Sequence, residues 1–93
     1  MLYLVVSQPG PNRPSEMAPY RKDYWPWIER NREAGLVKHV WARTGRGAVA
    51  VFDVDSNETL HRLLNEWCEI VPASFDIHPL VDSAQAQAFL NKT

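Results

Sequence analysis

The fold of this 93-residue chain is decided by one central stretch, Gly35-Leu36-Val37-Lys38-His39-Val40-Trp41, continued by Phe52-Asp53-Val54-Asp55-Ser56 and Leu60-His61. A glycine commonly follows the last residue of a helix, and β-branched and aromatic residues favour a strand. The pattern predicts strands at residues 37–44 and 48–54, and the two glycines between them supply the positive φ values of a hairpin turn. Asp55 or Ser56 then caps the next helix. The centre is therefore predicted as helix end, strand, turn, strand and helix start.

The segments before this stretch extend the pattern. An apolar run at residues 2–7 predicts a first strand, which the proline-rich residues 9–14 end. A helix is expected from Ser15 or Glu16 onward. An interior proline removes a helical hydrogen bond, so we expect a kink or break near residues 22–26. One face of this helix is formed by Tyr20, Tyr24, Trp27, Ile28 and Asn31.

The segments after it complete one domain. The second long helix carries an apolar stripe, residues 74–80 alternate like a half-buried strand, and Ser83 is expected to cap a last short helix. The order β-α-β-β-α-β-α predicts an α+β fold of the ferredoxin-like type, with a four-stranded antiparallel sheet and a C-terminal helix, as a single domain over residues 1–93.

The third strand is apolar on both of its faces. Ala48, Ala50 and Phe52 share one face, and Val49 and Val51 share the other. A sheet that is buried on both faces needs a second layer. We therefore expect a homodimer or a higher oligomer of dimers.

The same residues resemble the muconolactone δ-isomerase-like family. In that family a Gly-x-x-basic-His-x-Trp segment opens the second strand, and a Phe-Asp-Val-x-Ser turn leads into a helix that carries Leu-His. This order is kept here with almost the same spacing, over roughly residues 30–80, and the opening Met1-Leu2-Tyr3 agrees with it. The resemblance implies that two sheets pack into a dimeric α/β barrel, with the isomerases assembling further into rings of dimers.

The resemblance also implies an enzyme, a small-molecule isomerase that shifts a double bond of a lactone or related cyclic organic acid by cofactor-free proton transfer. Those isomerases carry a His and a Lys where this chain has Leu4 and Val6, which indicates a more apolar or aromatic ligand here. Two alternatives stay open: a cyclase or cofactor-free monooxygenase for an aromatic or polyketide-like substrate, and a non-catalytic ligand-binding dimerisation module. RNA-recognition domains share the element order, but Ala48 and Ala50 stand where their base-stacking aromatics belong.

The second strand carries the first candidate catalytic residues. By alternation, Val37, His39, Trp41 and Arg43 share one face, and imidazole, indole and guanidinium groups together indicate a lined cavity. His39 is the candidate general base, because imidazole titrates near neutral pH. Arg43 is the candidate group that holds a substrate carboxylate. The structural alternative is that His39 makes a structural hydrogen bond and Arg43 an interface ion pair.

His61 and His78 are the other candidate catalytic residues. His61 lies on the second long helix with Asn65 and Cys68 on the same side, where a structural role between helix and sheet is the alternative. His78 shares a strand face with Asp76, and an exposed edge gives the same pattern. The residues expected to bind substrate are Tyr3, Ser7, Tyr24, Trp25 and Trp41.

Composition narrows the classes of function. The formal net charge is −1, with ten basic and eleven acidic residues spread along the chain, so nucleic acid is not an expected partner. The chain has no basic leader and no apolar run of about 20 residues, so we expect a cytoplasmic protein without a membrane span. The three histidines lack metal-ligand spacing and no glycine-rich phosphate loop is present, so neither a metal nor another cofactor is expected.

Overall fold

The computed structural model describes residues 1–91, whose strands and long helices follow the predicted order. The elements are β1 (Leu2–Pro9), the 3₁₀ helix η1 (Pro14–Met17), α1 (Ala18–Glu33), β2 (Val37–Ala42), β3 (Ala48–Asp53), α2 (Asn57–Ile70), β4 (Ala73–Leu80) and α3 (Ser83–Asn91). The strands form one antiparallel sheet in the order β2-β3-β1-β4. The predicted ferredoxin-like α+β fold is therefore confirmed.

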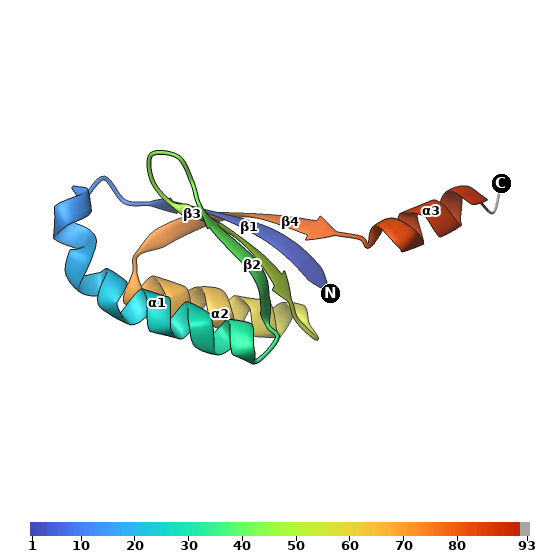
Figure 1. The fold of residues 1–93 in the computed structure, drawn as a ribbon, viewed down its shortest axis with the longest axis horizontal. Coiled ribbons are helices and arrows are strands. Elements are labelled where there is room, and N and C mark those ends of the chain that lie inside the picture. The colour runs from blue at the N-terminus through green and yellow to red at the C-terminus, as the bar shows by residue number, and fades with distance from the viewer. Residues whose placement is uncertain (92–93) are drawn as a thin grey trace.

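The sheet has one covered face and one bare face. Helices α1 and α2 lie side by side against the same face, which we call the inner face, and no described helix lies over the opposite, outer face (Figure 1). Successive side chains of β1 point to opposite faces of the sheet. Tyr3, Val5 and Ser7 are buried on the inner face, whereas Leu4 and Val6 are only half-buried on the outer face. None of the described helices is long and apolar enough to cross a membrane.

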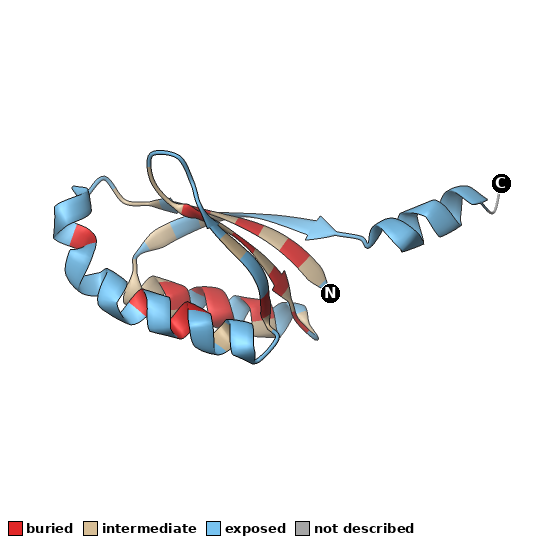
Figure 2. Cartoon of the chain, in the orientation of Figure 1, coloured by how far each residue is buried: buried red, intermediate tan, exposed pale blue. Residues whose placement is uncertain are grey.

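The core fills the space between the inner face and the two helices, as the buried residues in Figure 2 show. Phe52 and Ile28 are fully buried, one from the sheet and one from α1, and each such side chain contributes about 1.5–3 kcal/mol on burial. The rest of the core comes mainly from the apolar stripe predicted for α2. Its buried residues are Leu60, Leu63, Leu64 and Trp67.

Aromatic rings form the centre of this core. The ring centroid of Trp67 lies 5.1 Å from that of Tyr24, 6.0 Å from that of Trp27 and 5.2 Å from that of Phe75. The Trp27 indole donates a hydrogen bond of 2.9 Å to Glu66, and this bond lowers the pKa of the Glu66 carboxyl, with Arg62 adding to the effect. Helices α1 and α2 are therefore joined by contacts between their aromatic rings and by the hydrogen bond from Trp27 to Glu66 at the edge of the core.

A β-bulge in β2 corrects the predicted arrangement of its side chains. Val37 pairs with Phe52, but His39 pairs with the next residue, Val51, so Lys38 is an extra residue in the strand. The extra residue reverses the alternation beyond it. Val37 is buried on the inner face, whereas His39 points to the outer face, so the expectation that these side chains share one face is wrong.

Three further expectations about element ends need correction. Helix α1 starts at Ala18 after the 3₁₀ turn and continues without a break through Pro26. The Asp82 side chain, and not Ser83, caps α3, because the Ala84 amide donates to the Asp82 carboxylate at 2.8 Å. Strand β2 ends at Ala42 and not at residue 44, because the chain turns into the hairpin loop there. The predicted cap of α2 is confirmed, since the Ser56 hydroxyl accepts from the Thr59 amide.

Two parts of the described structure are not covered by other elements. Across the outer face, the register places His39, Val51, Leu4 and His78 in one row, with Val49 and Val6 in the row beside it. Helix α3 projects beyond the end of β4, away from the sheet, and none of its described residues is buried (Figures 1 and 2).

We expect the Gly47→Ala variant to lose more stability than Gly45→Ala. Both glycines have positive φ, 96° and 94° respectively, a conformation that costs other residues about 1–2 kcal/mol. A Cβ on Gly47 would also lie 2.5 Å from the Ser7 carbonyl oxygen, whereas one on Gly45 would meet no atom within 4 Å. Urea unfolding should show a loss on the order of 3 kcal/mol for Gly47→Ala. Equal losses in the two variants would contradict a steric role for the Ser7 contact.

Candidate functional site

A cavity of about 440 Å³ lies at the end of the sheet where β1 and β2 finish and β3 and β4 begin. The start of α1, the end of α2 and the β2–β3 loop enclose it, so the cavity lies between the inner face and its helices. We call it the arginine cavity. The lining side chains used below are Ser7, Met17, Arg21, Tyr24, Trp25, Arg43, Arg46 and Trp67.

The β2–β3 loop forms one wall, and hydrogen bonds to β1 and to the segment after it hold the loop in place. The Arg43 amide donates to the Gly47 carbonyl at 2.9 Å and closes the loop. The Arg43 guanidinium donates to the Ser7 carbonyl at 3.2 Å, and the Ser7 hydroxyl accepts from the Ala48 amide at 2.9 Å. The Arg46 guanidinium donates to the Asn12 carbonyl. These bonds hold two guanidinium groups at the wall of the arginine cavity.

The charge of the arginine cavity is positive. Arg21, Arg43 and Arg46 line it, and none of the described lining residues is Asp, Glu or His. Within residues 1–91 none of these three arginines forms an ion pair. A guanidinium keeps its charge at all ordinary pH values and offers up to five N–H donors. The cavity is therefore suited to an anion.

The remaining wall is apolar and aromatic. Met17 and Trp67 are buried there, and Trp25, 46% exposed, packs edge-on against Tyr24 with ring centroids 5.1 Å apart. Tyr24 is 6% exposed, and its hydroxyl is buried without a hydrogen-bond partner among the described residues. Burial raises the pKa of Tyr24 far above its usual value, so the phenol stays protonated.

The structure brings four of the predicted site residues together. Ser7, Tyr24, Trp25 and Arg43 all line the arginine cavity, although they come from β1, α1 and the end of β2. Tyr3, which was predicted to join them, is instead buried in the core on the inner face. Arg43 lies just beyond the strand on which the sequence pattern placed it.

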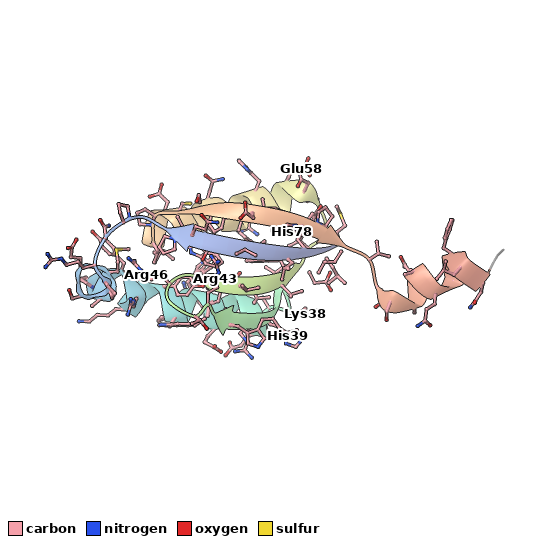
Figure 3. The ribbon with its side chains drawn as sticks, turned by 90° about the horizontal axis from the view of Figure 1, so that it is seen from above. Lys38, His39, Arg43, Arg46, Glu58 and His78 are labelled. Atoms are coloured by element: carbon pink, nitrogen blue, oxygen red, sulfur yellow. The ribbon has the colours of Figure 1, made fainter. Side chains whose placement is uncertain are left out.

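The other predicted residues lie elsewhere. His39 and Trp41 are exposed on the outer face, where their ring centroids are 5.3 Å apart, and they do not line the arginine cavity with Arg43. His78 is exposed on β4, at the opposite edge of the sheet from His39. Figure 3 shows Arg43 and Arg46 together near the β2–β3 loop and the two histidines well apart from them. The catalytic role of these histidines stays a prediction.

His61 lines a second, smaller cavity of about 260 Å³ between α2 and β4. Its neighbour Asn65 lies 3.2 Å from the imidazole, and Asn65 also donates to the His61 carbonyl at 2.8 Å. The Cys68 thiol donates to the Ala73 carbonyl. These bonds agree with the structural alternative for His61. Within residues 1–91, no three His, Cys, Asp or Glu side chains gather closely enough to hold a metal ion.

Of the lining side chains used here, the sequence did not indicate Met17, Arg21, Arg46 and Trp67 as site residues. Arg46 lies between the two glycines of the hairpin and was treated only as part of a turn. The sequence did contain an indication of this role, because Arg43 and Arg46 belong to the same tight loop and must lie close together. Arg21 precedes Tyr24 by three residues on α1, a spacing that places both on one side of a helix.

Comparisons with known proteins identify the family and support the fold. Residues 1–93 match the family described as a domain of unknown function, DUF3303. No curated protein shows significant similarity to the chain. The crystal structure of muconolactone isomerase superposes with a TM-score of 0.67 and 22% identity, over 88% of this chain and 90% of that chain. The 5-chloro-2-hydroxyhydroquinone dehydrochlorinase from Burkholderia phenoliruptrix, in complex with 2,5-dihydroxybenzoquinone, superposes with a TM-score of 0.57 and 12% identity, over 87% of this chain and 94% of that chain. The chain therefore has the fold of these two enzymes.

Proposed function

The chain belongs to the DUF3303 family, and we propose that it binds a small organic acid with an apolar, ring-like body in the arginine cavity and acts on it by proton transfer. The observation that carries this proposal is the set of three guanidinium groups, from Arg21, Arg43 and Arg46, without a described carboxylate beside them. Guanidinium groups bind carboxylates through paired, charge-assisted hydrogen bonds. The volume of about 440 Å³ suits a ligand of one substituted ring.

The apolar walls define the rest of the ligand. Met17, Trp25 and Trp67 offer flat or flexible apolar surfaces, which favour a planar ring over a polar chain. A free phosphate would leave this surface without contacts. The ligand class is therefore an aromatic or unsaturated cyclic acid, which includes the lactone acids that the family resemblance implies.

Two lines of support favour conversion of the ligand over binding alone. The two solved structures described above are of enzymes that, by their names, act on small organic molecules. In addition, removal of a proton next to a carbonyl places negative charge on oxygen, and fixed cations and donors lower the energy of that charge. The guanidinium groups of Arg43 and Arg46 supply such a field. The proposed reaction is a double-bond shift in a lactone or related cyclic acid.

A second candidate function is ligand binding without chemistry. It is favoured by one observation: none of the described residues that line the arginine cavity titrates as a base near neutral pH. His39, His61 and His78 remain the predicted bases, but in a single chain none of them lines this cavity. The two candidates share the binding step and differ only in proton transfer.

The outer face supports a proposed homodimer. Leu4, Val6, Val49 and Val51 form an apolar stripe across it, between histidines at the two edges. Packing two such stripes together would bury them and would give the barrel that the family resemblance implies. The arginine cavity lies on the other side of the sheet and would stay accessible.

We expect Arg43→Gln to weaken the binding of benzoate. Losing a charge-assisted pair should reduce the affinity about 10- to 100-fold, measured by isothermal titration calorimetry at constant ionic strength. Lys38→Gln is the matched control, because it removes one positive charge on an exposed part of β2 far from the cavity. Equal effects of the two substitutions would mean that only net charge matters, and no effect of Arg43→Gln would exclude the proposed site.

Proton transfer is tested by solvent-deuterium exchange into muconolactone and related butenolides. We expect measurable exchange by the wild type and a loss of at least about 10-fold in Arg43→Ala. His39→Ala tests the predicted base. Because His39 lies on the outer face and does not line the arginine cavity, a loss of about 100-fold or more would place the proton transfer outside this cavity, and unchanged exchange would exclude His39 as the base. Absence of exchange by a wild-type protein that binds benzoate would support binding without chemistry.

The assembly is tested by size-exclusion chromatography with light scattering. We expect at least twice the mass of one chain for the wild type at micromolar concentration. Val51→Glu should reduce this mass to that of a monomer, because it places a charge in the apolar stripe. Asn65→Glu, on the exposed side of α2, is the control and should leave the assembly unchanged. A monomeric wild type would contradict the proposed barrel.

A further inference from the structure

The buried hydroxyl of Tyr24 lacks a hydrogen-bond partner in the described part of the chain. Buried hydroxyl groups are normally hydrogen-bonded, and one without a partner destabilises the folded protein. Tyr24 is only 6% exposed, and its hydroxyl is the buried side-chain polar atom that lacks a partner among residues 1–91. A phenylalanine would fill the same space without this cost. The hydroxyl therefore indicates a partner that is absent when the cavity holds no ligand.

The ring of Tyr24 is held firmly in the wall of the arginine cavity. Trp25 contacts it edge-on at 5.1 Å and 72°, and Trp67 contacts it at 5.1 Å and 53°. Trp27 lies 6.2 Å away. A ring packed by three others has little freedom to turn its hydroxyl to solvent. Tyr24 lines the cavity, so the cavity is the side from which a ligand reaches this residue.

The polar groups that line the cavity are mainly donors. Arg21, Arg43 and Arg46 donate only. The Ser7 oxygen already accepts from the Ala48 amide, so its own hydrogen remains available for donation. Burial keeps the phenol of Tyr24 protonated, which makes it a donor as well. A complementary ligand presents oxygen acceptors at more than one place.

We propose that the ligand carries, besides its carboxylate, a second oxygen that accepts a hydrogen bond from the hydroxyl of Tyr24. This inference rests on the proposed function and makes its ligand class narrower: a hydroxylated or oxo-substituted cyclic acid, with the carboxylate at Arg43 and Arg46 and the second oxygen across the ring. Tyr24 is then a residue that determines specificity, and it selects such acids over acids with an unsubstituted ring.

The test compares benzoate with 2-, 3- and 4-hydroxybenzoate by isothermal titration calorimetry, in the wild type and in Tyr24→Phe. We expect at least one hydroxybenzoate to bind the wild type about three- to tenfold more tightly than benzoate. In Tyr24→Phe this advantage, taken as the ratio to the benzoate affinity of the same variant, should fall below about twofold. Tyr20→Phe is the matched control, since Tyr20 lies one turn earlier on α1 and is 47% exposed.

The outcomes separate the two proposals. If benzoate binds but no hydroxybenzoate gains affinity, or if the gain persists in Tyr24→Phe, the role of Tyr24 is overturned and the proposed function stands. If none of the four acids binds the wild type, the proposed function fails and this inference fails with it.

A thermal-unfolding measurement without ligand adds an independent result. Removing an unpartnered hydroxyl should leave the Tm of Tyr24→Phe unchanged or raise it by about 2–6 °C. A Tm lowered by several degrees would mean that the hydroxyl has a partner within the folded protein, and would overturn the proposal.

Discussion

The contact between Ser7 and the β2–β3 loop is the constraint on which the site depends. Ser7 uses its hydroxyl to accept the Ala48 amide and its carbonyl to accept the Arg43 guanidinium. The same carbonyl lies so close to Gly47 that no side chain fits there. The loop is therefore held against β1 by both hydrogen bonds and shape. Because Arg43 and Arg46 belong to this loop, the position of the positive charge in the cavity follows from a polar residue in the first strand.

The bulge in β2 determines which side chains of this strand lie on each face of the sheet. Without it, His39 would lie on the inner face with Val37. With it, the imidazole lies on the outer face beside an apolar stripe, and the inner side keeps arginines and aromatic rings. One extra residue, Lys38, thus separates a cationic ligand cavity from a face suited to self-association. This separation explains why the residues most like the isomerase pattern are not those that line the cavity.

The sequence predicted the element order, the hairpin glycines and the Ser56 cap, because each depends on local spacing. It also placed Ser7, Tyr24 and Arg43 near one ligand. It did not reveal the bulge, since nothing near Lys38 differs from an ordinary strand and the shift arises from pairing with β3. The sequence did not indicate that Arg46 lines the cavity, because the direction of a side chain in a turn is set only when the loop packs against β1.

The central claim is that the arginine cavity binds a cyclic organic acid through the guanidinium groups of Arg43 and Arg46. A crystal structure of the protein grown with 4-hydroxybenzoate tests it most directly. We predict electron density for the ring between Trp25 and the β2–β3 loop, with a carboxylate oxygen about 2.7–2.9 Å from a guanidinium nitrogen of Arg43 or Arg46. Density for the compound only on the outer face or at other surface positions, with water filling the cavity, would contradict the claim.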